Sequence, residues 1–465
     1  MKKGFQRPWE NDAIRWWSVV IWGVVWIGLF THLNSPSELE RRATEEFALR
    51  RVAEAATLQH FAGSSSPYWL AKAFGFDPES LREETAELFD EFMAEGELPA
   101  SVAAHWAVMF DALGDPSRAK EAWEQINAST PLGEKRKEIA LALIEDAEPS
   151  ASLRAWTIMR YRQGISELPT WLLLVRESDS EGEQVRRWME EKGTAMIRRG
   201  MFAHGVSLLV CLAALGGGIA FLRRRKELSL SAPPFRLSAQ GWNSRYALRE
   251  FFIAELVGVG AAFAVGFLLG QLGYGVLGWM LSGIAIFVVP AIWLSYRLTP
   301  GPRAALRLFR IRDSGWSYRQ LTVFTAAGLC FFAMGIGILF LLDPDGSGSI
   351  SDSLRPGDLD SPGNVWQSFL LAVILAPIGE EWIFRGFLYG GLRKRCGPVL
   401  AAVLASGCFA AVHGYSWLGL VTVFGYGLVF CWLYQRSGSL VPGMLVHAIY
   451  NGVVTLQLVS WFSLH

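Results

Sequence analysis

Long apolar runs separated by short polar stretches dominate this chain. The first run extends from about Ile14 to His32, and eight more follow after Gly200. A helix of about 20 apolar residues spans the roughly 30 Å hydrocarbon core of a bilayer. The pattern therefore predicts an all-α, polytopic membrane protein with about nine transmembrane helices. The eight later runs are Phe202–Leu222, Phe251–Leu272, Gly275–Tyr296, Leu321–Leu342, Val365–Leu392, Pro398–His413, Trp417–Tyr434 and Leu440–Phe462.

Residues 35–199 have the opposite character, because they are charged and amphipathic. Asp77-Pro78 is a helix-starting pair, and apolar residues recur after it at helical spacing until Gly96. A second helix is predicted over residues 100–113. This part of the chain therefore reads as a soluble helical domain.

One segment of this domain, LGDPSRAKEAWEQI (residues 113–126), resembles the second half of a tetratricopeptide (TPR) repeat. Only one copy is found, without a clear 34-residue period. The prediction is a helical, TPR-like domain, and whether it binds a protein partner or is a bundle without a partner stays open. Its predicted packing face consists of Ala119, Ala122, Trp123 and Ile126.

The composition agrees with a membrane protein. Hydrophobic residues make up 51% of the 465, with 20 Trp and 29 Phe, and the formal net charge is zero. A neutral chain offers no basic surface for nucleic acid. The five cysteines contain no CxxC pair, which gives no indication of a disulfide framework or a zinc knuckle. The first run is long, Trp-rich at its ends and lacks a small-residue cleavage pattern, so we expect a retained anchor.

Basic residues indicate the orientation. They concentrate in stretches that share one side of the membrane if nine spans alternate, and the positive-inside rule makes that side cytoplasmic. The domain at 35–199 and the C-terminus then face outward, with Arg198 and Arg199 as the exception. A large outward domain favours a bacterial inner membrane. The basic residues are Lys2, Lys3, Arg7, Arg15, Arg223, Arg224, Arg225, Lys226, Arg297, Arg303, Arg307, Arg310, Arg312, Arg319, Arg393, Lys394, Arg395 and Arg436.

Three ionisable residues interrupt the apolar run Val365–Leu392, in the stretch APIGEEWIFRGFLY. A charge near the bilayer centre costs about 2.5–3.5 kcal/mol, so such residues are candidates for function. Glu381 and Arg385 are four residues apart and are predicted to form an ion pair on one helix face. Glu380 lies about 100° around the helix and is left unpaired, which suits a general base. A purely structural clamp between helices is the alternative.

Two later runs carry polar residues at helical spacing. The segment CFAAVHG places Phe409 and His413 one turn apart, and VHAIYNG places His447 and Asn451 on one face. A single intramembrane histidine is more often a hydrogen bond between helices than a catalyst. Two histidines together with Asn451 and the unpaired Glu380 favour a site.

The motifs on these three predicted spans resemble those of a known family. They read Glu-Glu-x-x-x-Arg, Phe-x-x-x-His and His-x-x-x-Asn. It is the CAAX protease and bacteriocin-processing (CPBP, or Abi) family of intramembrane proteases, which includes the type II CAAX prenyl endopeptidases. The resemblance covers about Arg249 to Ser463. The catalytic set that it implies is Glu380, Glu381, Arg385, His413, His447 and Asn451.

The resemblance also implies roles for these residues. In that family the first glutamate and the histidine of the second motif activate the attacking water, and the last His and Asn stabilise the oxyanion. Glu380 and His413 would then activate water, while His447 and Asn451 would form the oxyanion hole. The neighbouring Glu-Arg pair would hold the helix and tune the electrostatic field.

Members of the family are often described as metalloproteases. If zinc were present, Glu380, His413 and His447 would be its ligands. However, the chain has no HExxH motif, and no single span supplies two ligands one turn apart. The sequence favours a metal-free mechanism that needs no cofactor, and it leaves Zn²⁺ open as the alternative.

The resulting hypothesis is an intramembrane endopeptidase that cleaves a membrane protein or a lipid-tethered peptide. It divides the chain into an anchor (1–34), an extracytoplasmic helical domain (35–199), a second span with a basic cytoplasmic linker (200–248) and a protease core (249–465). One alternative is a non-catalytic scaffold or receptor whose helical domain binds a partner. Another is a proton-coupled transporter, although repeated halves are not found. The sequence does not indicate the natural substrate.

Overall fold

The computed structural model describes residues 16–33, 38–62, 86, 89–90, 100–126, 130–162, 168–176, 180–230, 244–298, 318–342, 362–413, 415 and 417–462. Within these ranges every regular element is a helix and no strand occurs. Several predicted features lie outside the described residues. They are the basic N-terminus, most of the helix predicted after Asp77-Pro78, and most of the basic loop between the fourth and fifth runs.

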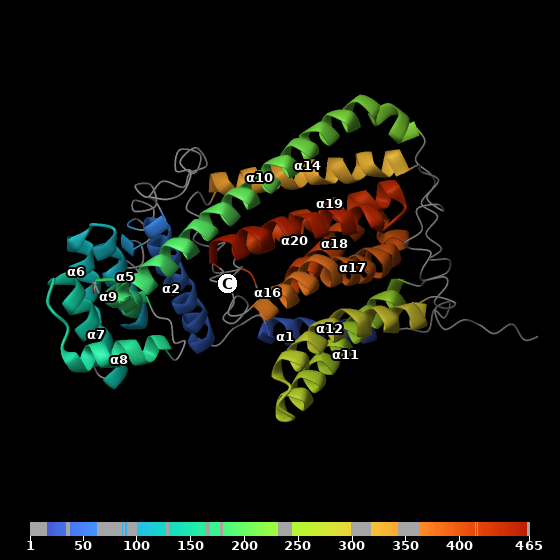
Figure 1. Cartoon of the computed structure of the whole chain (residues 1–465). Helices are drawn as coiled ribbons and strands as arrows, with labels where there is room; N and C mark the ends of the chain where they lie inside the picture. Colours follow the sequence, from blue (N-terminus) through green and yellow to red (C-terminus); the bar gives the residue numbers. More distant parts are fainter. Residues whose placement is uncertain are drawn as a thin grey trace, which may run out of the picture. The chain divides into compact units, whose positions relative to one another are not determined.

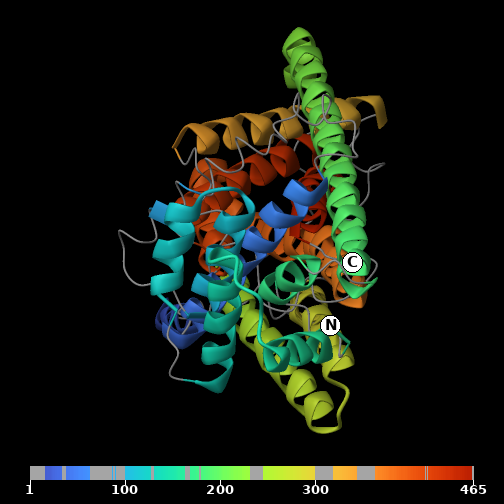
Figure 2. The same cartoon turned by 60° about the vertical axis from the view of Figure 1, so that its left-hand side comes forward.

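The helices form two compact units. The membrane unit comprises residues 1–36, 207–352 and 365–455, and the helical unit comprises residues 37–206, 353–364 and 456–465. Figures 1 and 2 show the long helix α10 (Ser180–Leu230), whose first part belongs to the helical unit and whose second part belongs to the membrane unit.

Among the described residues, six helical stretches are long and apolar enough to cross a membrane, and shorter apolar helices lie at Trp17–Phe30, Leu321–Gly335 and Arg395–Ala411. The chain is therefore a multi-pass helical membrane protein, whereas the count of nine spans stays a prediction. The apolar helices are α1 (Trp16–Leu33), α10, α11 (Ser244–Gln271), α12 (Gly275–Leu298), α14 (Tyr318–Leu342), the composite helix that begins with α16 (Pro362–Phe369), α18 (Gly390–Ala411), α19 (Trp417–Ser437) and α20 (Val441–Phe462).

The helical unit packs around α5 (Ala100–Ala112), which confirms the second predicted helix of this region. Helix α6 (Pro116–Glu124) follows; its N-cap is Asp115, whose carboxylate accepts a hydrogen bond from the N–H of Arg118. The predicted packing face is confirmed, because Ala119, Ala122 and Ile126 are buried and Trp123 packs against the same core. A TPR-like fold stays a prediction. The other helices in the described part of this unit are α2 (Glu38–Ala62), α7 (Pro131–Ile144), α8 (Ala151–Arg162) and α9 (Leu168–Arg176).

Helices α2 and α10 cross closely at Gly193, where an added Cβ would collide with the carbonyl oxygen of Leu58. We expect Gly193→Ala to lower the free energy of unfolding by about 1–3 kcal/mol, the usual cost of overpacking. Thermal unfolding of the full-length protein in detergent measures this. Gly205→Ala on the same helix is the control, because no atom of the described residues lies within 4 Å of its Cβ position. Equal midpoints for the two variants would contradict the close crossing.

Small residues also set the helix spacing in the membrane unit. Helix α11 packs on α12 where Gly258 meets Pro290, with only 2.5 Å between an added Cβ and the proline Cγ. Gly217 of α10 lies directly against Ala326 of α14. Close approach of backbones at small residues is a general way to associate helices in lipid.

The boundary between the sixth and seventh apolar runs is a kink inside α18. Gly397 has φ of 74°, a left-handed conformation that glycine adopts without strain, and Pro398 follows it. The chain therefore changes direction between the run that holds the glutamates and the run that holds His413.

The sixth apolar run is not one regular α-helix. After α16 it forms a π-helix, η4 (Leu370–Leu375), then α17 (Ala376–Glu380), and a second π-helix, η5 (Glu381–Tyr389). Pro377 explains the first irregularity, because it has no N–H and its ring clashes with the carbonyl four residues earlier. The N–H of Ala376 accordingly bonds to the carbonyl of Leu371, five residues back. Short π segments of this kind are frequent at functional sites.

Candidate active site

The ion pair predicted between Glu381 and Arg385 is present. Arg385 Nη1 lies 2.9 Å from Glu381 Oε1, and each side chain is only 1% exposed. The guanidinium group also lies over two aromatic rings, 4.1 Å from the centroid of Phe409 and 4.7 Å from that of Phe430. Cation–π contacts of this kind strengthen when they are desolvated. The charge of Arg385 is therefore held by a carboxylate and two rings that come from three helices.

Glu380 is oriented differently. Its side chain is 13% exposed, and within the described residues it forms no ion pair with an arginine or lysine. Its Oε2 is buried without a hydrogen-bond partner among these residues. Glu380 closes α17 and Glu381 opens η5, so the two carboxylates leave the helix at the junction between its α and π parts.

His447 of α20 lies between the two carboxylates. Its Nε2 is 3.8 Å from Glu380 Oε2, and its Nδ1 is 3.4 Å from Glu381 Oε1. The imidazole stacks on Phe430, with 4.9 Å between the ring centroids and 26° between the planes. Spacing in the sequence placed His447 on the face of Asn451, but it gave no sign that this ring would bridge the glutamate pair.

His413 lies near the same group, two residues after the last residue of α18. Its Nδ1 is 2.7 Å from the carbonyl oxygen of Phe409. A carbonyl only accepts, so Nδ1 carries the hydrogen and Nε2 keeps its lone pair. His413 interacts electrostatically with Glu380, His447 and Arg385. The structure thus brings both intramembrane histidines to the glutamate pair.

Asn451 has a structural partner as well. Its Nδ2 donates a hydrogen bond to the carbonyl of Ala372, at 2.7 Å. That carbonyl has lost its helical donors, because the N–H of Ala376 bonds to Leu371 instead and the residue five positions on is Pro377. An amide nitrogen carries two hydrogens, so Asn451 retains a second one for another acceptor.

We expect Asn451→Ala to lower the free energy of unfolding by about 1 kcal/mol, because the Ala372 carbonyl then lacks a donor in the membrane. Chemical or thermal unfolding in detergent measures this loss. Thr422→Val is the control, since the Thr422 hydroxyl only bonds to the carbonyl of Leu418 within its own helix. A stability of Asn451→Ala equal to that of the control would contradict the role of this bond.

Among the residues that the structure describes, no group of three or more His, Cys, Asp and Glu side chains is arranged to hold a metal ion. Zinc bound by Glu380, His413 and His447 stays a prediction from the sequence, and no step of the proposed reaction passes through a metal.

One residue of this region was not predicted as a site residue from the sequence. Glu255 of α11 is 6% exposed and interacts electrostatically with Glu380. The criterion that identified Glu380, an ionisable residue inside an apolar run, applies equally to Glu255 in the run Phe251–Leu272. It was not recognised because no motif or helical partner marks it in the sequence.

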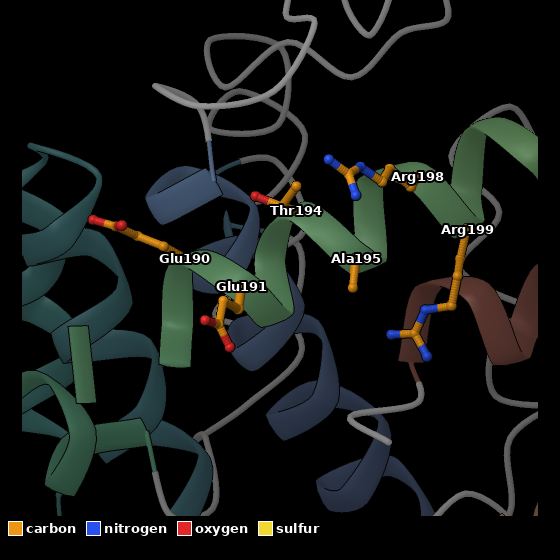
Figure 3. A pocket seen from close by; sticks show the side chains of 6 residues that line it. All are labelled: Glu190, Glu191, Thr194, Ala195, Arg198 and Arg199. Carbon is orange, nitrogen blue, oxygen red and sulfur yellow. The ribbon is translucent and has the colours of Figure 1, made fainter. Parts of the chain in front are cut away.

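A surface hollow lies elsewhere, in the helical unit (Figure 3). All of its lining residues belong to α10, and none is a candidate catalytic residue. They are Glu190, Glu191, Thr194, Ala195, Arg198 and Arg199.

Comparison with known proteins finds a family match over the part of the chain that holds the candidate residues. Residues 362–453 match the family model of the Type II CAAX prenyl endopeptidase Rce1-like proteins. This segment contains every candidate residue predicted from the sequence. Residues 362–453 form an Rce1-like domain. The UPF0177 protein YxdF of Lactococcus lactis subsp. lactis (strain IL1403) is 25% identical over 141 residues, which cover 29% of this chain and 76% of that protein. No solved structure matches the chain.

The predicted resemblance is thus confirmed for the C-terminal part of the chain. The Rce1-like domain supports intramembrane CAAX protease activity in general, and it lies in a multi-pass membrane protein. The roles of individual residues, the use of a metal and the direction of the helices in the membrane belong to the proposal below.

Proposed function

We propose that this protein is an intramembrane endopeptidase in which Glu380 and His413 activate the hydrolytic water. The observation that carries the proposal is the position of Glu380, with its Oε2 atom buried, beside both intramembrane histidines inside the Rce1-like domain. Burying charged and polar groups in a membrane is costly, so such a group is a candidate for function. Peptide hydrolysis needs an activated water and donors for the tetrahedral oxyanion.

In the first step the Glu380 carboxylate removes a proton from water as the water oxygen attacks the peptide carbonyl carbon. The Nε2 lone pair of His413 accepts a hydrogen bond from the same water and orients it. A C–O bond forms, and the electron pair of the carbonyl moves to its oxygen. The product of this step is a tetrahedral oxyanion and a protonated Glu380.

In the second step the oxyanion reforms the carbonyl and the C–N bond breaks. The proton on Glu380 passes to the leaving nitrogen, so the products are a carboxylic acid and an amine. Hydrogen bonds from His447 Nε2 and the second amide hydrogen of Asn451 stabilise the oxyanion.

Glu381 and Arg385 position this machinery in the proposal. The ion pair fixes η5, and Glu381 also faces Nδ1 of His447 at 3.4 Å. Gly443 leaves the room for this carboxylate, because an added Cβ would come within 3.1 Å of Glu381 Oε2. The pair thus controls where His447 points without contacting the substrate.

The proposed reaction uses no metal or other cofactor. The substrate is a membrane-associated protein or a lipid-tethered peptide, cleaved within the membrane or from its cytoplasmic side. The proposed orientation places the N-terminus in the cytoplasm and residues 35–199 outside, in a bacterial inner membrane. The helical unit then holds a protein partner or the substrate on that outer side.

The test uses purified full-length protein in liposomes and a peptide library in two forms, with and without a transmembrane anchor. We expect new fragments from anchored peptides only, detected by mass spectrometry, and none from liposomes that lack the protein. Equal cleavage of the unanchored peptides would contradict intramembrane action. No cleavage of either form would contradict the protease and favour a non-catalytic scaffold.

A further inference from the structure

Two buried glutamates lie on the same helix, α11, and they have opposite surroundings. Glu250 is 1% exposed and fully paired, since Arg249 Nη2 donates at 2.7 Å, Arg297 Nε at 3.1 Å and Trp293 Nε1 at 3.1 Å. Glu255 is 6% exposed, and its Oε1 has no hydrogen-bond partner among the described residues. Glu250 reads as a structural clamp between α11 and α12, whereas Glu255 lacks a structural explanation.

Glu255 is placed at the candidate active site by the packing of α11. The ring of Phe251, four residues earlier on the same face, lies 5.5 Å from the ring of Phe384 in η5. Phe384 in turn lies four residues after Glu380. Glu255 and Glu380 therefore each lie one helical turn from this aromatic contact, and they interact electrostatically.

Each of the two carboxyl groups has one oxygen atom that could bind a water molecule. Glu255 Oε1 and Glu380 Oε2 are both buried, and within the described residues neither has a hydrogen-bond partner. A buried polar atom left without a partner is destabilising, and buried water molecules usually satisfy such atoms. A buried water needs two to four polar partners, and carboxyl oxygens of this kind supply them.

We propose that Glu255 is a second carboxyl group for the hydrolytic water, which it holds together with Glu380. This inference rests on the proposed function. In the first step above, Glu380 takes the proton while Glu255 keeps the water in line with the peptide carbonyl. Glu255 undergoes no bond change, and the balance of the reaction is unaltered.

The experiment compares Glu255→Leu with Glu255→Gln in the full-length protein. Leucine fills a similar volume without a polar group, whereas glutamine still binds water. We expect Glu255→Leu to lower kcat about tenfold or more at unchanged KM, without lowering the unfolding temperature. Glu255→Gln is expected to keep kcat within about threefold of wild type. In a Glu380→Gln background, Glu255→Leu is expected to add no further loss, because both residues act on one water.

Glu250→Leu is the matched control, and we expect the reverse pattern for it. Removing a paired carboxylate leaves its cationic partners buried, so stability falls while kcat of the folded fraction is kept. A wild-type kcat for Glu255→Leu, or a lower unfolding temperature with unchanged kcat, would overturn the inference. A wild-type protein that hydrolyses no anchored peptide would instead overturn the proposed function itself. The two failures are therefore distinguishable.

Discussion

Replacing Glu380 by glutamine is expected to lower kcat for hydrolysis of an anchored peptide by about 10²–10⁴-fold. Glutamine has the same shape but cannot accept a proton from water, so the general base is lost. KM is expected to stay unchanged, because the group acts in the chemical step and not in substrate binding. Steady-state cleavage in liposomes, followed by mass spectrometry or a quenched fluorophore, measures both constants.

Stability separates a catalytic role of Glu380 from a structural one. Within the described residues Glu380 forms no ion pair with an arginine or lysine, so Glu380→Gln is expected to unfold at the wild-type temperature. Glu381→Gln is the comparison, because it removes the carboxylate partner of Arg385 and is expected to destabilise the fold. A Glu380→Gln variant with kcat within about threefold of wild type would contradict the assignment of the base.

Replacing Arg385 by methionine is expected to lower the free energy of unfolding by about 3–5 kcal/mol. The substitution leaves the carboxylate of Glu381 buried and without its cation, and removal of one partner of a buried ion pair has this cost. It also removes the contacts with the rings of Phe409 and Phe430. Equilibrium unfolding in detergent, followed by the change in helical content, measures the loss.

A double-mutant cycle tests the same ion pair more strictly. Because no charge is left uncompensated, the double variant Glu381→Gln with Arg385→Met is expected to recover much of the stability lost in Arg385→Met alone. Arg385→Lys, which keeps the charge but not the planar group, is expected to lie between wild type and Arg385→Met. If the losses of unfolding free energy in the two single variants simply add in the double variant, the two side chains do not interact, which would contradict the ion pair.

Local spacing was enough to predict several parts of this structure. The apolar runs gave the membrane helices because length and hydropathy are properties of each segment alone. The pair of Glu381 and Arg385 followed from residues one turn apart, and the buried face of α6 followed from helical periodicity in the same way. Each of these features depends on residues within one helix, so residue spacing along the sequence is enough to predict it.

Features that depend on several helices were not predictable in this way. The π-helix η4 before Glu380 follows from how Pro377 and its neighbours share hydrogen bonds, and Asn451 on another helix bonds to one of its carbonyls. The position of His447 between two carboxylates and the approach of Glu255 to Glu380 depend on how α11, α20 and the glutamate helix pack. Contacts between separate helices do not correspond to a fixed spacing of residues along the sequence.

The central claim is that Glu380 and His413 activate water for peptide hydrolysis without a metal. Its most direct test is cleavage of an anchored peptide by the wild-type protein in ¹⁸O-labelled water, with and without excess 1,10-phenanthroline. The account predicts one ¹⁸O atom from the solvent in the new C-terminal carboxyl group and the same rate with the chelator. A rate that is lost with the chelator and restored by zinc would contradict it and would make Glu380, His413 and His447 metal ligands.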